Sequence, residues 1–269
     1  MGHQVWIKRA IVLALVVTVA ACGRGNRFGS VDESATPAQI IALADAQVER
    51  RKFSRAGDLY LEVERLHPYT VEAEYAVIQA AKAYQSGKKR IESRAAAQRY
   101  IDFYPAGEFA ALAHYLVALS YYDQIVDVQR DQENTFRALQ ALRIVIERFP
   151  NSQYAELAAP KFTTALNQLA GKEMDVGRYY LKRGQYAAAI GRFDAVINEY
   201  GETPHRAEAL HRLVEAYLSL GLNAEAAQAG AQLATQYPDS SWNVAAQSLL
   251  ATGQQSDSGA GLFGQVFRR

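Results

Sequence analysis

Cysteine is almost absent from this sequence of 269 residues, because Cys22 is the only one. A single thiol excludes an internal disulfide framework. Hydrophobic residues make up 49% of the chain, which is enough to bury a core in one elongated domain or two compact ones.

A strong net charge is missing as well. The chain has 29 Lys and Arg against 28 Asp and Glu, and its first 21 residues hold two of the bases, Lys8 and Arg9, but no acid. Without that segment 27 basic and 28 acidic side chains remain, a formal charge of −1. The basic field that nucleic-acid binding requires is therefore absent.

The one conspicuous apolar run, from Ala10 to Ala21, is too short to span a bilayer. It follows the basic Lys8 and Arg9, as in a secretory signal peptide, which we place over residues 1–21. The run ends in Val19-Ala20-Ala21-Cys22, which resembles the bacterial lipobox of an aliphatic residue, two small residues and cysteine.

In lipobox proteins the cysteine sulfur carries the lipid and cleavage occurs just before it, so we expect acyl chains such as palmitate on Cys22. Several chains give a lasting anchor, whereas one binds only marginally. An ordinary signal peptide with a chance or buried cysteine is the alternative. Gly23 stands where Asp would favour the inner membrane, which indicates the outer membrane, and residues 22–36 read as a flexible tether.

Strand patterns are not found, and from Thr36 onward the pattern is helical. Thr36-Pro37 with Gln39 predicts an N-cap, a first-turn proline and a capping box. An aromatic residue or histidine followed by Pro or Gly recurs as a stop signal at His67-Pro68, Tyr104-Pro105, Phe149-Pro150, Tyr200-Gly201 and Tyr237-Pro238.

Positions at fixed distances before these stops also match. Twelve residues before the Pro or Gly a small residue recurs (Ala56, Ala138, Ala189, Ala226), and eight before it a large apolar one (Tyr60, Leu142, Phe193). Gly177 and Tyr180 precede Gly201 by 24 and 21 residues, and Val214 and Tyr217 precede Pro238 by the same distances. These offsets are those of a helix–turn–helix repeat of about 34 residues, the tetratricopeptide type.

We therefore predict an all-α, right-handed solenoid of about five tetratricopeptide-type repeats over residues 37–252. A generic helical bundle or coiled coil is the alternative. The expected repeats are 37–70, 71–107, 108–150, 151–203 and 204–238, followed by a capping helix over 239–252 and a disordered Gly/Ser tail over 253–269.

The stops are 37, 45, 51 and 37 residues apart, so two repeats are longer than the others. In the third repeat the extra length falls in the polar stretch from Gln124 to Glu133, between its two helices. In the fourth it falls in Asn151 to Leu169, where we expect an added or lengthened helix.

A catalytic constellation is also lacking, so we expect no enzyme activity, no metal and no cofactor. The five histidines form no HExxH motif, and no Walker loop is present. Gly259 to Gly264 does match GxGxxG, but it lies in the tail with no strand before it and no room for a βαβ unit after it.

With lipobox and repeats in place, the chain resembles the outer-membrane assembly lipoprotein family BamD (ComL) from about Thr36 to Leu250. The residues that carry the resemblance are Leu59-Tyr60, Glu64 to Pro68, Leu119 to Ile125 with Arg130-Asp131-Gln132, Phe149 to Tyr154, Gly177 to Tyr180, Ile190 to Phe193, Glu208-Ala209-Leu210, Arg212-Leu213 and Glu215-Ala216-Tyr217. The tyrosine-rich third repeat and its Arg-Asp loop are the more specific of these.

The resemblance implies a non-enzymatic lipoprotein on the periplasmic face of the outer membrane. Such a protein binds the periplasmic domains of BamA and other Bam lipoproteins, and helps fold and insert unfolded β-barrel precursors. The C-terminal repeats would dock on BamA, with Tyr179, Arg183 and Arg192 on that side. The N-terminal repeats would receive a terminal strand of the substrate.

Helix A of each repeat lines the concave face of such a solenoid, which places Tyr75, Gln85, Tyr115 and Tyr122 near a peptide groove. A position in the core between repeats is the alternative for these tyrosines, and an idle surface side chain is the alternative for Arg192. Asp127, Arg130 and Asp131 are expected in the insertion loop of the third repeat. Two other classes stay open: another periplasmic repeat lipoprotein, associated with Tol, peptidoglycan or pilus assembly, and a repeat domain that serves a bound hydrolase.

Overall fold

The computed structural model describes residues 31–125 and 132–256, and in these ranges every regular element is an α-helix. The chain divides into two compact units, residues 1–87 and 88–269, which are described separately. The boundary falls between the two helices that the sequence analysis placed in the second repeat. The all-α prediction is confirmed.

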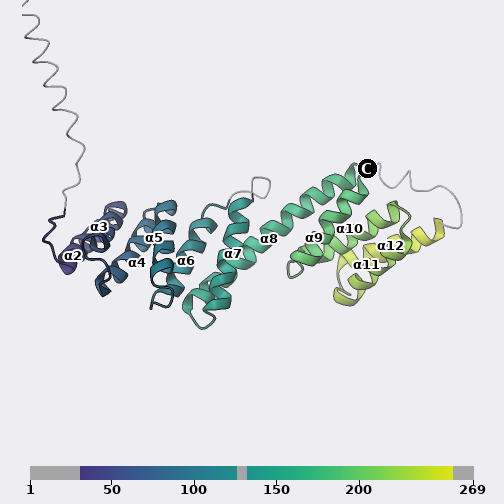
Figure 1. Ribbon diagram of the computed structural model, residues 1–269. Coiled ribbons are helices and arrows are strands. Elements are labelled where there is room, and N and C mark those ends of the chain that lie inside the picture. The colour runs from purple at the N-terminus through teal and green to yellow at the C-terminus, as the bar shows by residue number, and fades with distance from the viewer. Residues whose placement is uncertain (1–30, 126–131, 257–269) are drawn as a thin grey trace, which may run out of the picture. The chain divides into compact units, whose positions relative to one another are not determined.

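The first unit contains α2 (Pro37–Glu49), α3 (Phe53–Leu66) and α4 (Val71–Ser86), with α3 packed against both of the others (Figure 1). The predicted capping box is present. Oγ1 of Thr36 accepts from the backbone N–H of Gln39, and Oε1 of Gln39 accepts from the backbone N–H of Thr36. Gly57 lies under Tyr84, since a Cβ at residue 57 would be 2.6 Å from that ring. The close approach of α3 and α4 thus depends on glycine.

The second unit contains eight described helices, each packed against the next along the chain (Figure 1). They are α5 (Arg90–Phe103), α6 (Ala110–Tyr122), α7 (Glu133–Arg148), α8 (Gln153–Lys182), α9 (Tyr186–Glu199), α10 (His205–Ser219), α11 (Asn223–Gln236) and α12 (Ser241–Ser256). The C-terminal helix α12 packs against both α10 and α11, and it continues four residues past the expected end of the capping helix.

The predicted stops coincide with helix ends. The helices α3, α5, α7, α9 and α11 each end one residue before the stop residue, which becomes the C-cap. In two of the turns that follow, a hydroxyl caps the next helix. Oγ1 of Thr70 accepts from the Ala73 amide, and Oγ of Ser152 accepts from the Ala155 amide. Local chemistry therefore sets these boundaries.

The small residues twelve positions before the stops (Ala56, Ala138, Ala189, Ala226) are fully buried, as the repeat pattern predicts. Gly177 of α8 faces α9, because a Cβ there would lie 2.5 Å from the ring of Phe193. Phe193 is itself fully buried. The offsets read from the sequence thus mark the places where paired helices touch.

The expected lengthening of the fourth repeat is confirmed, because α8 runs for 30 residues. The ring of Phe162 lies in its N-terminal half and packs against the core of α6 and α7, whereas Gly177 in its C-terminal half packs on α9. Pro160 sits within the helix and leaves one carbonyl without its helical donor. Among the described helices α7 and α9 both contact α8 but not each other.

Candidate partner-binding surfaces

Tyr179 and Arg183, near the C-terminal end of α8, form an exposed pair. Tyr179 is 52% exposed, and the guanidinium of Arg183 lies 4.5 Å from the centre of its ring. Tyr180 meets Tyr179 edge to face at 5.7 Å. An aromatic ring and a cation that stand together in solvent can contact both apolar and anionic groups of a partner.

A hollow of about 550 Å³ adjoins this pair. Its lining consists of Asp175, Val176, Arg178, Tyr179, Tyr180 and Lys182. Gly177 faces α9, and Tyr179 lies two residues on, about 200° around the helix. The Tyr179–Arg183 pair therefore points away from α9.

Arg192 lies on α9, and its Nη1 is 3.0 Å from Oε2 of Glu173 on α8. The Arg192 side chain is 45% exposed, so part of the guanidinium still reaches solvent. The family resemblance grouped Arg192 with Tyr179 and Arg183. The structure brings the latter two together but places Arg192 on a different side of the α8–α9 pair, where it also joins the two helices.

An ion-pair network between α8 and α10 was not foreseen from the sequence. Nη1 of Arg178 lies 3.0 Å from both carboxylate oxygens of Glu208, and Nε of Arg212 lies 3.3 Å from the same carboxylate. Residues 178 and 208 are 30 positions apart, and no repeat rule pairs them. Only the antiparallel packing of intervening α9 brings them together.

The same network reaches α12. His211 is 4% exposed, its ring centre lies 5.3 Å from that of Trp242, and its Nε2 lies 3.5 Å from Glu215. Burial by itself would raise the pKa of Glu215, but hydrogen bonds from His211 and Arg212 outweigh it and hold that pKa below its usual value. Glu215 is therefore a charged group inside the C-terminal packing.

The four expected groove residues do not share one environment. In the first unit Tyr75 is 38% exposed, and Gln85 is half-buried near the end of α4. In the second unit Tyr115 is 8% exposed and packs against Tyr154 in the α6–α7–α8 core, which corresponds to the alternative of a core position. Tyr122 is half-buried, with the Lys161 ammonium 5.0 Å from its ring centre.

Tyr121, beside Tyr122, is a candidate that the sequence analysis did not single out. The guanidinium of Arg94 on α5 lies 4.3 Å from its ring centre, and that of Arg137 on α7 lies 5.9 Å away. Arg137 also pairs with Glu133 at 2.6 Å, whereas Arg94 has no carboxylate within ion-pair distance among the described residues. Cations from both neighbouring helices, α5 and α7, therefore lie over the Tyr121 ring.

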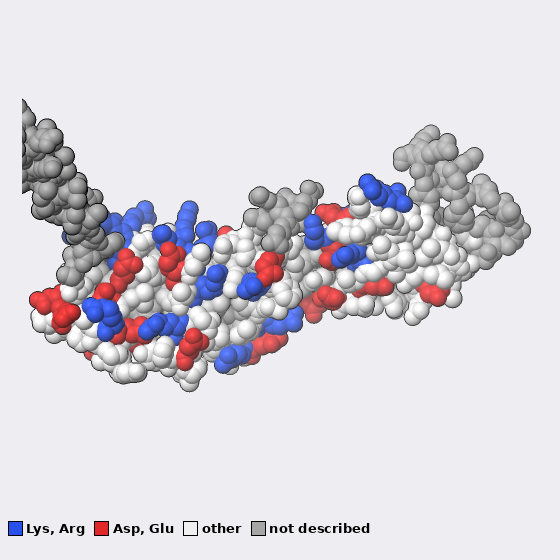
Figure 2. All heavy atoms as spheres, turned by 45° about the horizontal axis from the view of Figure 1, so that its top comes forward, with Lys and Arg blue, Asp and Glu red and all other residues white. Residues whose placement is uncertain are grey.

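Several expected residues lie outside the described ranges: Cys22, Gly23, Asp127, Arg130 and Asp131. Within those ranges no helix is both long and apolar enough to cross a membrane, and no three metal-binding side chains gather. On the face in Figure 2, basic and acidic side chains are interspersed.

Comparison with known proteins gives a consistent result. Residues 33–233 match the model of the family described as outer membrane lipoprotein, YfiO. The outer membrane protein assembly factor BamD of Caulobacter vibrioides is 42% identical over 245 residues, which cover 90% of this chain and 80% of the relative. The BamD proteins of Rickettsia prowazekii and of Neisseria meningitidis serogroup A are 35% and 30% identical, over 85% and 87% of this chain and 91% and 92% of theirs.

Proposed function

Since the chain belongs to the YfiO family of outer-membrane lipoproteins, which includes the BamD assembly factors, we propose that it is a non-catalytic scaffold of the β-barrel assembly machinery. In this role it binds the periplasmic domains of BamA and other Bam lipoproteins, and receives unfolded β-barrel precursors. The observation that carries the proposal is the 42% identity to an assembly factor over 90% of the chain.

Attachment to the membrane comes from a lipid on Cys22 in this proposal. The support is the lipobox-like Val19-Ala20-Ala21-Cys22, together with the family to which the chain belongs. Cys22→Ser should leave the protein uncleaved or release it from the outer-membrane fraction. Continued fractionation of this variant with the outer membrane and into a detergent phase would refute the lipid anchor.

Docking on BamA is assigned to the exposed pair Tyr179 and Arg183 and to Arg192. The first two present an aromatic face and an unpaired guanidinium, a combination common where binding energy is concentrated. Arg192 can add a charge-assisted contact at the cost of its bond to Glu173. Precursor recognition is assigned to the half-exposed Tyr75, with Gln85 and Tyr122, whereas Tyr115 supports the groove from the core.

The test is co-purification of BamA with the membrane-extracted lipoprotein. The double variant Tyr179→Ser/Arg183→Ser should lower BamA recovery at least tenfold, because removing two contacts of about 1 kcal/mol each has that effect. Tyr69→Ser, which removes a tyrosine that is 91% exposed in the first unit, is the matched control and should leave recovery unchanged. Equal recovery with both variants would contradict the assignment.

The intramolecular role of Arg192 can be separated from a role in binding. The Glu side chain of Arg192→Glu would repel Glu173 and loosen the packing of α8 against α9. This loosening alone is enough to reduce BamA co-purification. The exchange Arg192→Glu/Glu173→Arg restores the internal ion pair but reverses its direction. If Arg192 contacts BamA, the exchanged protein is as stable as the wild type yet still fails to bind, whereas restored binding would assign Arg192 to structure only.

A further inference from the structure

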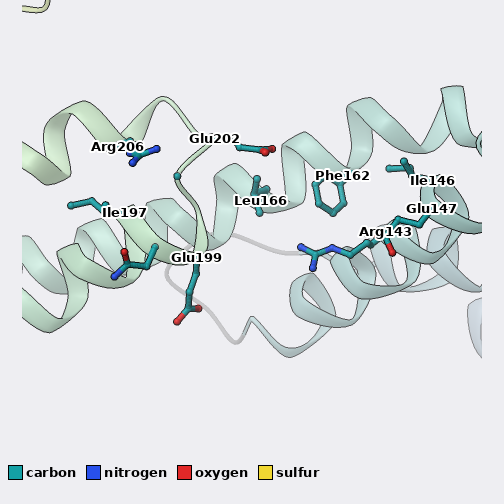
Figure 3. Close-up of a pocket in the computed structure, with 11 residues that line it drawn as sticks. Arg143, Ile146, Glu147, Phe162, Leu166, Ile197, Glu199, Glu202 and Arg206 are labelled. Atoms are coloured by element: carbon teal, nitrogen blue, oxygen red, sulfur yellow. The ribbon is translucent and has the colours of Figure 1, made fainter. Parts of the chain in front are cut away.

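A hollow of about 530 Å³ lies where α7, the middle of α8 and the α9–α10 turn come together (Figure 3). It is separate from the surface around Tyr179. The apolar side chains in its lining are Ile146, Phe162, Leu166 and Ile197. Its volume is in the range of pockets that hold ligands or side chains of a partner.

Two departures from the regular repeat coincide with this space. The helix α8 is about twice as long as its neighbours, so α7 packs on its first half and α9 on its second, and a gap is left between them. The stop at Tyr200 is followed by Gly201, where the other four stops have proline. A Cβ at residue 201 would lie 2.7 Å from the Ile197 carbonyl oxygen and 3.1 Å from Nη1 of Arg206.

Arg143 and Arg206 stand on opposite sides of the apolar floor formed by Phe162 and Leu166 (Figure 3). The Arg143 guanidinium lies 5.6 Å from the centre of the Phe162 ring. Nε of Arg206 is buried and has no hydrogen-bond partner. Neither arginine has a carboxylate within ion-pair distance among the described residues. The two Nη atoms of Arg206 also lack a partner among the described residues but are not closed to solvent, so an incoming oxygen can accept from them.

Acidic residues also line the hollow, namely Glu147, Glu199 and Glu202. All three are exposed, so water solvates their carboxylates, and the side chain of Glu199 points away from the floor (Figure 3). Salt screens these carboxylates and the exposed guanidinium of Arg143 alike. The guanidiniums of Arg143 and Arg206 meet no carboxylate among the described residues, so both can donate to an incoming oxygen.

We propose that this hollow binds an internal segment of a partner protein in which a large apolar side chain lies between two acidic side chains. The apolar side chain occupies the floor, and one carboxylate meets Arg143 while the other meets Arg206. Because the two arginines lie on opposite sides, the bound chain continues past the hollow in both directions. The chain end of a partner, with its single carboxylate, would satisfy one arginine only.

The test uses full-length lipoprotein in detergent and a synthetic peptide, acetyl-Gly-Ser-Asp-X-Glu-Ser-Gly-amide, with X the photoreactive benzoylphenylalanine. After irradiation, mass spectrometry should place the cross-link on residues that line the hollow. A peptide with Asn and Gln in place of Asp and Glu should label about fivefold less, since charge-assisted bonds are lost. Equal labelling by the neutral peptide, or a cross-link elsewhere, overturns the proposal.

Arg143→Gln should also lower the labelling about fivefold, with a circular dichroism spectrum like that of the wild type because Arg143 is exposed. Arg148→Gln is the matched control: it makes the same change on the same helix, outside the hollow, and should label normally. Unchanged labelling of Arg143→Gln would overturn the proposal. So would stronger labelling by a peptide that ends in a free carboxylate directly after X, which would identify a chain end as the occupant.

Discussion

The two halves of the second unit hold their cations in different ways. From α5 to the first half of α8, Arg94, Lys161 and Arg143 lie over the rings of Tyr121, Tyr122 and Phe162. From the second half of α8 to α12, Arg178, Arg192 and Arg212 pair with carboxylates, whereas Arg183 lies over the ring of Tyr179.

This difference separates two uses of charge in one repeat architecture. A carboxylate neutralises its cation and ties two helices together, so the network in the C-terminal half serves packing. An aromatic ring positions a cation but leaves its charge available to an anion from outside. The cations that lie over rings, Arg94, Lys161 and Arg143 in one half and Arg183 in the other, are therefore the ones available to acidic groups.

The largest expected effect concerns packing in the two halves. Phe193→Ala should lower the free energy of unfolding by about 3–5 kcal/mol, because the ring is fully buried against Gly177. Phe162→Ala, the same change at a half-buried ring, should lower the free energy of unfolding clearly less. Urea unfolding of both variants measures the difference, and equal losses would show that the two halves are packed alike.

A smaller effect is expected from the charges. Glu208→Gln should lower the free energy of unfolding by about 1–3 kcal/mol, because two arginines lose their shared carboxylate in a partly buried site. Arg94→Gln should lower the free energy of unfolding by about 1 kcal/mol or less, since it removes only a half-buried cation–π contact. If Arg94→Gln destabilises the protein as much as Glu208→Gln, the distinction between the halves fails.

The smallest effect is a difference in acid sensitivity. Burial, and then the nearby Arg148, hold the pKa of His114 below its usual 6.5, so its contribution to stability is full above that value and is lost as the pH falls below it. The pKa of Glu215 is held below its usual 4.5, so its contribution is lost only on further acidification. Hydrogen exchange, corrected for intrinsic rates, should show α6 and α7 loosening before α10.

His114→Gln provides the control for this sequence of events. The variant should lack the first loss of protection near α6 and keep the later one near α10. Loosening of α10 before α6 in the wild type would contradict the assignment of these two groups.

Features that depend on local sequence could be predicted. The five stops, the Thr36 capping box and the buried Ala56 and Ala189 follow from backbone chemistry and fixed spacing within one repeat. The lengthened α8 followed from the distance between stops, because extra residues with a helical pattern must extend or add a helix.

Features that depend on the packing of distant segments could not be predicted. Tyr115 and Tyr122 are both tyrosines of α6, but only the packing of Tyr154 against Tyr115 makes the latter a core residue. The contact of Arg178 with Glu208 requires the geometry of three helices. Gly201 was recognised as a stop, but the hollow beside it appears only when the gap between α7 and α9 is known.

The most direct test of the assembly role is depletion of this lipoprotein in its own cells, followed by measurement of folded, heat-modifiable β-barrel protein in the outer membrane. The account predicts that folded barrels decline and unfolded precursors accumulate, and that wild-type protein restores assembly while Tyr179→Ser/Arg183→Ser does not. Normal barrel assembly after depletion would contradict the account.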